Sequence, residues 1–312
     1  MSFPAPSAEP RREYPTVSGH RPVVGVSTKM YFSHARTTAF VSSVLALLRE
    51  APGAAALLRD RVDAFVAPDF VSIPATRAAV VAEAGAGAGA GARLVVGAQD
   101  CAAADEGPYT GEVSPAVLRE LGCGLAEVGH AERRRLFGES DDLVRRKAAA
   151  AARNGLVPLV CVGEVSPPPP PPPPPPQRRD SRADGEAGAE LFSSSPGVRE
   201  AAEEVLRQVK AVLDGLDGGA DVILAYEPVW AIGAPEPASA EHVRGVVRLV
   251  RESEAVRGRP GRTRIVYGGA AGPGLWGRLG GEVDGLFLGR FAHRPEQFVK
   301  MLYEVAGMDF QG

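Results

Sequence analysis

Short apolar runs alternate with longer amphipathic stretches through most of this 312-residue chain. Such runs predict strands, and the stretches between them predict helices. The predicted strands are residues 23–26, 64–67, 94–98, 125–128, 159–162, 223–226, 265–267 and 286–288. Helices are predicted at residues 35–50, 141–153, 198–213, 240–254 and 295–305. This alternation indicates right-handed crossovers and a parallel sheet, and eight such units favour an α/β fold closed into a single-domain (β/α)8 barrel.

The predicted barrel indicates where chemistry should be sought, because functional side chains of this fold lie at the carboxyl ends of the strands. Lys29, His130 and Glu227 each come just after an apolar run, on three different units. A lone histidine is more often a structural hydrogen-bonding residue than a catalyst, and an acid before a proline can simply end a strand. The coincidence of all three positions is hard to obtain from core packing and predicts one shared site.

Residues 224–233, Leu-Ala-Tyr-Glu-Pro-Val-Trp-Ala-Ile-Gly, are the most informative stretch of the chain. The apolar residues at its start predict a strand that places Glu227 at the rim of the barrel. The rigid segment Pro-Val-Trp follows, and then a turn of small residues. A loop with a stiff start and a mobile end can close over a substrate and expel water. Exclusion of water raises the basicity of a carboxylate, so this segment predicts a base beneath a lid.

The composition is that of a globular protein with a large core, since 45% of the residues are hydrophobic. The 35 basic and 38 acidic side chains leave a net charge of −3, which argues against nucleic acid or an anionic membrane as a partner. No apolar run reaches the ~18 residues of a membrane span. The three cysteines, Cys101, Cys123 and Cys161, lack zinc-type spacing and are expected to be reduced thiols of a cytoplasmic protein.

Some segments depart from the regular pattern. Residues 1–21 lack the apolar segment of a secretory signal and are predicted to be a disordered N-terminal arm before a barrel domain at 22–312. Alternating Gly and Ala at 85–91 predict a flexible turn. Residues 165–196 are a low-complexity insertion after the fifth strand, with unbroken proline at 167–176 that permits only polyproline II or coil. A proline-binding module could dock there, but a tolerated insertion is favoured because lengthening a surface loop costs little entropy.

Four further motifs follow in order along the chain. They are Gly-Ala-Gln-Asp at 97–100, Tyr-Thr-Gly-Glu-Val-Ser at 109–114, Cys-Val-Gly-Glu at 161–164 and Tyr-Gly-Gly at 267–269. With the segments around Lys29, His130 and Glu227, they make the chain resemble the triosephosphate isomerase family over nearly its whole length. The resemblance implies a TIM barrel that acts, without a cofactor or metal, as an aldose–ketose isomerase of small sugar phosphates. The family's usual substrates are dihydroxyacetone phosphate and glyceraldehyde 3-phosphate, intermediates of glycolysis and gluconeogenesis.

The resemblance also implies an assembly. The family forms homodimers in which the loop after the third strand, here residues 99–109, docks near the neighbour's active site. A homodimer is therefore expected for this chain. A tetramer stays open at this point.

The resemblance assigns roles to the residues already singled out. Glu227 corresponds to the base, His130 to the electrophile and Lys29 to the positive charge, and this family is itself the standard example of a glutamate base paired with a neutral histidine. A histidine at the start of a helix feels the positive end of the helix dipole, which disfavours the imidazolium form. Lys29 then compensates the developing negative charge in a dry site. Glu132 is expected to orient Lys29 or relay a proton, with a salt bridge to an arginine as the alternative.

The chain departs from the family pattern on the parts that hold the substrate. Ser27 replaces the usual asparagine, Ala270 the usual serine, and Gly289-Arg290 the usual Gly-Gly pair. The lid reads Ile-Gly-Ala-Pro-Glu-Pro at 232–237, where the family usually has Gly-Thr-Gly-Lys. Because the proton-transfer residues are retained, this pattern suggests that the chemistry is the same and that the contacts to the substrate have changed.

A phosphate-binding site can still be formed by backbone amides. Gly233, Ala270 and Gly289 are candidates, since amides bind phosphate whatever side chain they carry. Arg290 supplies a charged clamp or points outward, and Ser27 completes the predicted binding residues. A four-carbon erythrulose phosphate is the alternative substrate, and a non-catalytic scaffold or ligand-binding barrel is the alternative of another class. Retention of the lysine, histidine and glutamate argues against the scaffold.

Replacing residues 166–195 with a short Gly/Ser bridge should preserve both folding and activity, because a proline and polar tract buries too little apolar surface to be structural. Thermal unfolding and turnover of the deletion variant would be compared with those of the full chain. Loss of either property would show that the segment is an integral part of the barrel.

Overall fold

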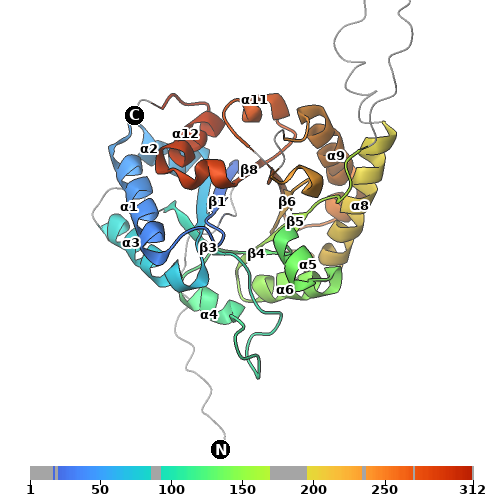
Figure 1. Cartoon of the computed structure of the whole chain (residues 1–312), viewed down its shortest axis with the longest axis horizontal. Helices are drawn as coiled ribbons and strands as arrows, with labels where there is room; N and C mark the ends of the chain where they lie inside the picture. Colours follow the sequence, from blue (N-terminus) through green and yellow to red (C-terminus); the bar gives the residue numbers. More distant parts are fainter. Residues whose placement is uncertain are drawn as a thin grey trace, which may run out of the picture.

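The computed structural model describes residues 17, 20–85, 93–168, 195–233, 237–269 and 271–310. Within these ranges, eight parallel strands pair in sequence order, and the eighth pairs with the first to close a barrel. Helices surround the strands (Figure 1). The strands are β1 (Val23–Ser27), β2 (Asp63–Ala67), β3 (Val95–Ala98), β4 (Leu125–Val128), β5 (Val157–Val162), β6 (Val222–Tyr226), β7 (Thr263–Tyr267) and β8 (Gly285–Leu288).

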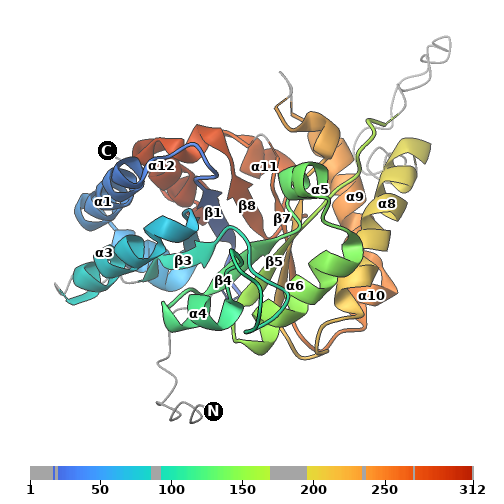
Figure 2. The same cartoon turned by 60° about the horizontal axis from the view of Figure 1, so that its bottom comes forward.

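The helices form the outer layer of the molecule. They are α1 (His34–Glu50), α2 (Ala54–Ala56), α3 (Ile73–Gly85), α4 (Pro115–Glu120), α5 (Ala131–Phe137), α6 (Asp141–Arg153), α8 (Pro196–Leu213), α9 (Ala240–Glu252), α10 (Glu254–Arg257), α11 (Leu275–Leu279) and α12 (Pro295–Ala306). Ser33, Ser140 and Ser239 begin three of them, and each hydroxyl accepts a backbone N–H of the first turn. Figure 2 shows α5 as a separate short helix ahead of α6.

The predicted (β/α)8 architecture is confirmed, and β4 and α6 have the predicted bounds. Other elements differ by one or two residues. β5 begins at Val157 rather than at residue 159, because Pro158 stays in register with Ala126 of β4 without interrupting the strand. α9 ends at Glu252 rather than at residue 254, because Ser253 is extended and starts α10.

A buried ion pair explains why two strands begin earlier than predicted. Asp63 opens β2, and Arg264 is the second residue of β7, where the apolar pattern did not include a charged residue. Arg264 Nη1 lies 3.2 Å from Asp63 Oδ2, and both side chains are almost fully buried. Arg21 reaches the other oxygen of Asp63. Charge pairing at the amino end of the barrel therefore takes the place of apolar packing.

The barrel interior is filled by alternate residues of the strands. Inward-facing side chains form one apolar cluster, which includes Phe65, Leu125, Leu159, Ile223 and Phe287. The outward-facing residues pack against the helices in a second, larger cluster. The ring of Phe65 occupies the space where Gly25 would carry a Cβ, so β1 requires glycine at that position. The interior is thus a packed core, and its upper layer forms the floor of the cavity described below.

Several predictions about organisation lie wholly or largely outside the described residues. These are the N-terminal arm at 1–21, the Gly/Ala stretch beyond Gly85, and residues 169–194 of the predicted insertion. Before that gap, Val165 donates its backbone N–H to Glu204 of α8 at 3.1 Å. In the described part of the chain no single helix is long and apolar enough to cross a membrane. Only α1 taken together with residues 54–61 meets the length and composition, with a bend of 112° between them.

Candidate active site

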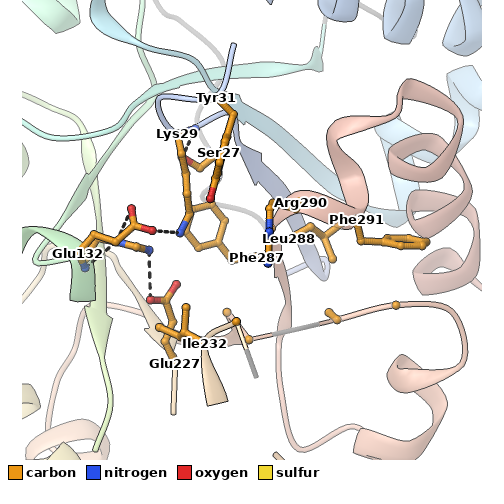
Figure 3. A pocket seen from close by; sticks show the side chains of 17 residues that line it. Ser27, Lys29, Tyr31, Glu132, Glu227, Ile232, Phe287, Leu288, Arg290 and Phe291 are labelled. Carbon is orange, nitrogen blue, oxygen red and sulfur yellow. Dashed lines mark hydrogen bonds and ion pairs between the residues drawn. The ribbon is translucent and has the colours of Figure 1, made fainter. Parts of the chain in front are cut away.

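A cavity of about 450 Å³ opens at the carboxyl ends of the strands. Lys29 from β1, His130 from β4 and Glu227 from β6 all line it, as does Glu132 of α5. Figure 3 shows the carboxylate of Glu132 against the Lys29 ammonium and Glu227 extending toward the same space from the other side. The structure therefore brings together the four residues that the resemblance predicts to be catalytic.

Lys29 is held in a strained backbone conformation. Its φ of 47° is the one positive value among the described residues other than glycine, and such a conformation persists only where the surroundings impose it. Gln99 imposes it here: its side-chain amide donates to Thr28 Oγ1 at 3.1 Å, to the Lys29 carbonyl at 3.2 Å and to the Ala67 carbonyl at 3.0 Å. Gln99 thus joins the carboxyl ends of the first three strands, a role that its sequence motif did not reveal.

The Lys29 ammonium binds Glu132. The Nζ–Oε1 distance is 2.8 Å. Burial lowers the pKa of Lys29, but its hydrogen bond to Glu132 and the neighbouring carboxylates outweigh that effect and raise the pKa above its ordinary value. Burial likewise opposes the ionisation of Glu132, while the hydrogen bond from Lys29 prevails and lowers its pKa. Lys29 is thus the ion-pair partner of Glu132, and whether Glu132 orients the lysine or relays a proton stays a prediction.

His130 is the N-cap of α5 and is held in one tautomer. Its Nδ1 accepts the backbone N–H of Glu132 at 3.1 Å. A neutral ring with Nδ1 as acceptor carries its proton on Nε2, and Nε2 lies 3.5 Å from Glu227 Oε2. Burial, followed by the charge of Lys29, lowers the pKa of His130 to about 4. The ring is therefore neutral at physiological pH and presents an N–H donor to the cavity.

Glu227 is buried just past the end of β6, with 3% of its surface exposed. Burial raises its pKa to about 8, an effect that Lys29 opposes and Glu132 reinforces. Two glycines make room for it. A Cβ on Gly268 would lie 2.5 Å from Glu227 Cγ, and one on Gly163 would collide with the Glu227 carbonyl oxygen. Glycine is thus required in the Cys-Val-Gly-Glu and Tyr-Gly-Gly motifs, because a larger residue at Gly163 or Gly268 would collide with Glu227.

The start of the lid is fixed by Glu164, whose carboxylate is almost fully buried. One of its oxygens accepts from Trp230 Nε1 at 2.8 Å and from Tyr226 Oη at 3.2 Å, and lies 2.9 Å from His242 Nε2 of α9. Its carbonyl accepts the N–H of Val229 at 2.9 Å. These contacts give the Pro-Val-Trp step its stiffness. The sequence marked Glu164 only as part of a motif, because all three side-chain partners lie more than sixty residues away.

Charged side chains also secure α5 from behind. Lys147 Nζ lies 2.6 Å from both Asp100 Oδ2 and Glu139 Oε1, and Arg133 contacts the same two carboxylates at 2.8 and 2.7 Å. Lys147, Asp100 and Glu139 are nearly fully buried. The network joins the loop after β3 to α5 and α6, and so fixes the helix on which His130 sits.

Four of the predicted phosphate-binding residues line the cavity: Ser27, Gly233, Gly289 and Arg290. Gly289 precedes a short helical turn, η5 (Arg290–His293). Arg290 is exposed, and Figure 3 places it at the side of the cavity nearest Tyr31 and Phe291. Ala270 lies outside the described residues, although its neighbours Gly269 and Ala271 line the cavity. A phosphate role for any of them stays a prediction.

The closed barrel, with its cavity at the carboxyl ends of the strands, has the form of a (β/α)8-barrel isomerase. The family model described as triosephosphate isomerase matches residues 22–167 and 195–305, and the chain belongs to the triosephosphate isomerase family. L-erythrulose-1-phosphate isomerase of Pectobacterium atrosepticum is 37% identical over 300 residues, which cover 95% of this chain and 100% of that protein. The enzyme of the same name from Rhizobium etli is 37% identical over 253 residues, 79% of this chain and 80% of that protein. Triosephosphate isomerase of Moorella thermoacetica is 36% identical over 275 residues, 86% of this chain and 92% of that protein.

Glu227→Asp should leave the fold intact and lower kcat more than about tenfold, roughly 1.4 kcal/mol of barrier, because the base retreats by one methylene. Steady-state kinetics and a thermal melt would check both parts. Glu252→Asp, the same change at an exposed position at the end of α9, is the matched control. Activity of Glu227→Asp within tenfold of the unaltered enzyme would exclude Glu227 as the base.

The pH profile of kcat/KM should rise as the pH increases through about 8, because Glu227 must lose its proton before it can act as a base. The substrate phosphate ionises near ~6 and gives a separate, earlier step. With its pKa at about 4, His130 is neutral throughout and adds no falling limb in the alkaline range. A profile that is already flat above roughly pH 7 would contradict the raised pKa of Glu227 in the free enzyme.

Proposed function

We propose that this protein isomerises a four-carbon ketose phosphate, erythrulose 1-phosphate, by proton transfer through an enediolate. The contact of His130 Nε2 with Glu227 beside the Lys29–Glu132 pair carries the proposed chemistry. The relatives named L-erythrulose-1-phosphate isomerase, one of them matched over its full length, support the four-carbon substrate. Ser27 in the cavity wall, where the family usually has a larger asparagine, supports it independently.

The proposed reaction moves one proton between C3 and C2. Glu227 takes the proton from C3, and the electrons of the C–H bond shift into an enediolate. His130 donates its Nε2–H bond to the developing oxyanion, while the Lys29 ammonium compensates its charge. Glu227 then returns the proton to C2, and a hydroxyl proton passes from O3 to O2. The carbonyl leaves C2 and appears at C3, with no oxidant or cofactor in the balance.

The raised pKa of Glu227 suits this task. A carboxylate in water is a weak base toward a C–H proton, and burial makes it stronger. The same burial keeps His130 neutral, so that it stabilises the oxyanion without first transferring its proton. For the phosphate, Gly233, Gly289 and the exposed Arg290 line the cavity, and Figure 3 shows Arg290 on the side away from Glu132. We assign these groups, together with Ala270, to phosphate binding.

Triose phosphates are the second candidate substrates. Dihydroxyacetone phosphate has the same phosphate and carbonyl as erythrulose 1-phosphate, with hydrogen in place of the C4 hydroxymethyl group. The triosephosphate isomerase relative of Moorella thermoacetica supports this alternative. A non-catalytic scaffold has less support, because two groups shifted by burial, His130 and Glu227, and the buried charge of Lys29 face one cavity, which is costly to stability and serves no purpose in a scaffold.

We also propose a homodimer, as the resemblance implies, and a cytoplasmic location, as expected from the three cysteines. Large apolar side chains are exposed close to the carboxyl face, among them Met30 at 97%, Val71 at 80% and Phe137 at 68%. Tyr109, in the loop after β3 that the family uses for docking, is 53% exposed. Figure 1 shows this loop extending beyond the ring of helices. An exposed apolar surface of this kind supports association with a second copy.

Purified protein should turn over erythrulose 1-phosphate with a kcat/KM at least about tenfold above that for dihydroxyacetone phosphate, which is ~1.4 kcal/mol of differential transition-state binding. Product formation from each substrate would be followed under identical conditions. Glu227→Gln, which keeps the shape of the side chain but cannot accept the proton, should abolish both activities. A preference for the triose would identify the protein as a triosephosphate isomerase, and no turnover of either would favour a binding protein.

A further inference from the structure

The strand that precedes His130 carries a buried acid that the proposed mechanism does not use. Glu127 lies on β4, in a run that otherwise predicts an apolar strand, and only 3% of its surface is exposed. It is two residues from Leu125, whose side chain belongs to the inward-facing cluster, so Glu127 also faces the barrel interior. It occupies the layer directly beneath the catalytic groups.

The polar atoms of Glu127 are poorly satisfied by the protein. Oε1 lies 3.9 Å from Cys161 Sγ, a weak hydrogen bond at best. Oε2 is buried and makes no hydrogen bond of ordinary geometry among the residues described, although a hydrogen bond from the Ser27 side chain stabilises the charged form of the carboxyl. A buried polar group without a partner costs free energy, and native proteins retain few of them without a functional reason.

The surroundings of Glu127 favour its neutral acid form. Burial raises the pKa of its carboxyl well above the ordinary range, and the carboxylates of Glu227 and Asp100 add to the effect. Lys29 and the hydroxyl of Ser27 act in the opposite direction without prevailing. In that form the side chain offers both an O–H donor and a carbonyl acceptor.

Ser27 separates this acid from the cavity. It ends β1, lines the cavity, and its hydroxyl accepts the backbone N–H of Lys29 at 3.3 Å. Asparagine, the usual family residue at this position, has a larger side chain than serine. Ser27 therefore lines the cavity with a small hydroxyl, and Glu127, which is not itself a lining residue, lies behind it.

We propose that Ser27 and Glu127 form a polar recess in the cavity floor that accepts the C4 hydroxymethyl group of a four-carbon ketose phosphate. This assignment rests on the proposed function and names the residues that set its specificity. Ser27 contacts the C4 hydroxyl directly, and Glu127 acts from beneath as a hydrogen-bond donor and acceptor. A triose phosphate has no such group and leaves the recess unpaired, so the site discriminates against it.

Three variants test the recess. Glu127→Leu keeps the volume but removes the polar atoms, and should lower kcat/KM for erythrulose 1-phosphate at least about tenfold while changing that for dihydroxyacetone phosphate less than about threefold. Ser27→Asn should shift the ratio of the two kcat/KM values in the same direction. Glu127→Gln keeps a neutral donor and acceptor, and should retain the ratio within about threefold.

Controls separate a specificity role from a structural one. Glu83→Gln alters another buried carboxyl, paired with Arg49 outside the barrel, and should leave the ratio unchanged. Thermal melts would accompany each variant, and if Glu127→Leu fails to fold, Ser27→Asn carries the test. Equal losses on both substrates would overturn the recess and indicate a role in packing or in the charge balance of Lys29.

The same assays distinguish failure of the recess from failure of the proposed function. If the unaltered enzyme prefers erythrulose 1-phosphate and the ratio stays constant in Glu127→Leu and Ser27→Asn, the function stands and the recess is wrong. If the unaltered enzyme does not turn over erythrulose 1-phosphate, both are wrong. A selective loss in these two variants, with retention in Glu127→Gln, is the result that supports the recess.

Discussion

The burial of the Glu227 carboxyl is the constraint on which the site depends. Excluding water from this group opposes its ionisation and makes it a stronger base. The same dry environment keeps His130 neutral, and it makes Lys29 necessary as the nearby positive charge. The three groups follow β6, β4 and β1. Closure of the barrel brings the ends of these strands together, and so places all three groups in one dry cavity.

Residues around the cavity fix the conformation of Lys29, the tautomer of His130 and the position of Glu227. Gln99 maintains the strained backbone of Lys29, and the backbone N–H of Glu132 fixes the tautomer of His130. Gly163 and Gly268 leave the space that Glu227 occupies. The supports of Lys29 and Glu227 come from other strands or loops, whereas that of His130 comes from the helix it caps. Precision in the site is therefore a property of the closed sheet, because correct register between neighbouring strands is what brings supports and catalytic groups together.

The sequence predicted the strand–helix order, the closed barrel and the placement of Lys29, His130 and Glu227, because apolar periodicity and position after a strand are local properties. It missed the early starts of β2 and β7, because Asp63 and Arg264 look unsuitable for a core until they are seen as partners. It missed the roles of Gln99 and Glu164 for the same reason, since their partners are distant in the chain. Glu127 went unnoticed within an apolar run, because only the three-dimensional structure shows that its carboxyl is buried in the barrel interior behind Ser27.

The Glu164 carboxylate has a mechanical consequence for the lid. Its donors Tyr226 and Trp230 precede the lid tip, whereas His242 follows it in α9. One buried oxygen thus anchors both ends of the segment to a single point on the loop after β5. Attachment of the predicted lid therefore depends on Glu164 and its three partners, and not on the residues that connect the two anchors.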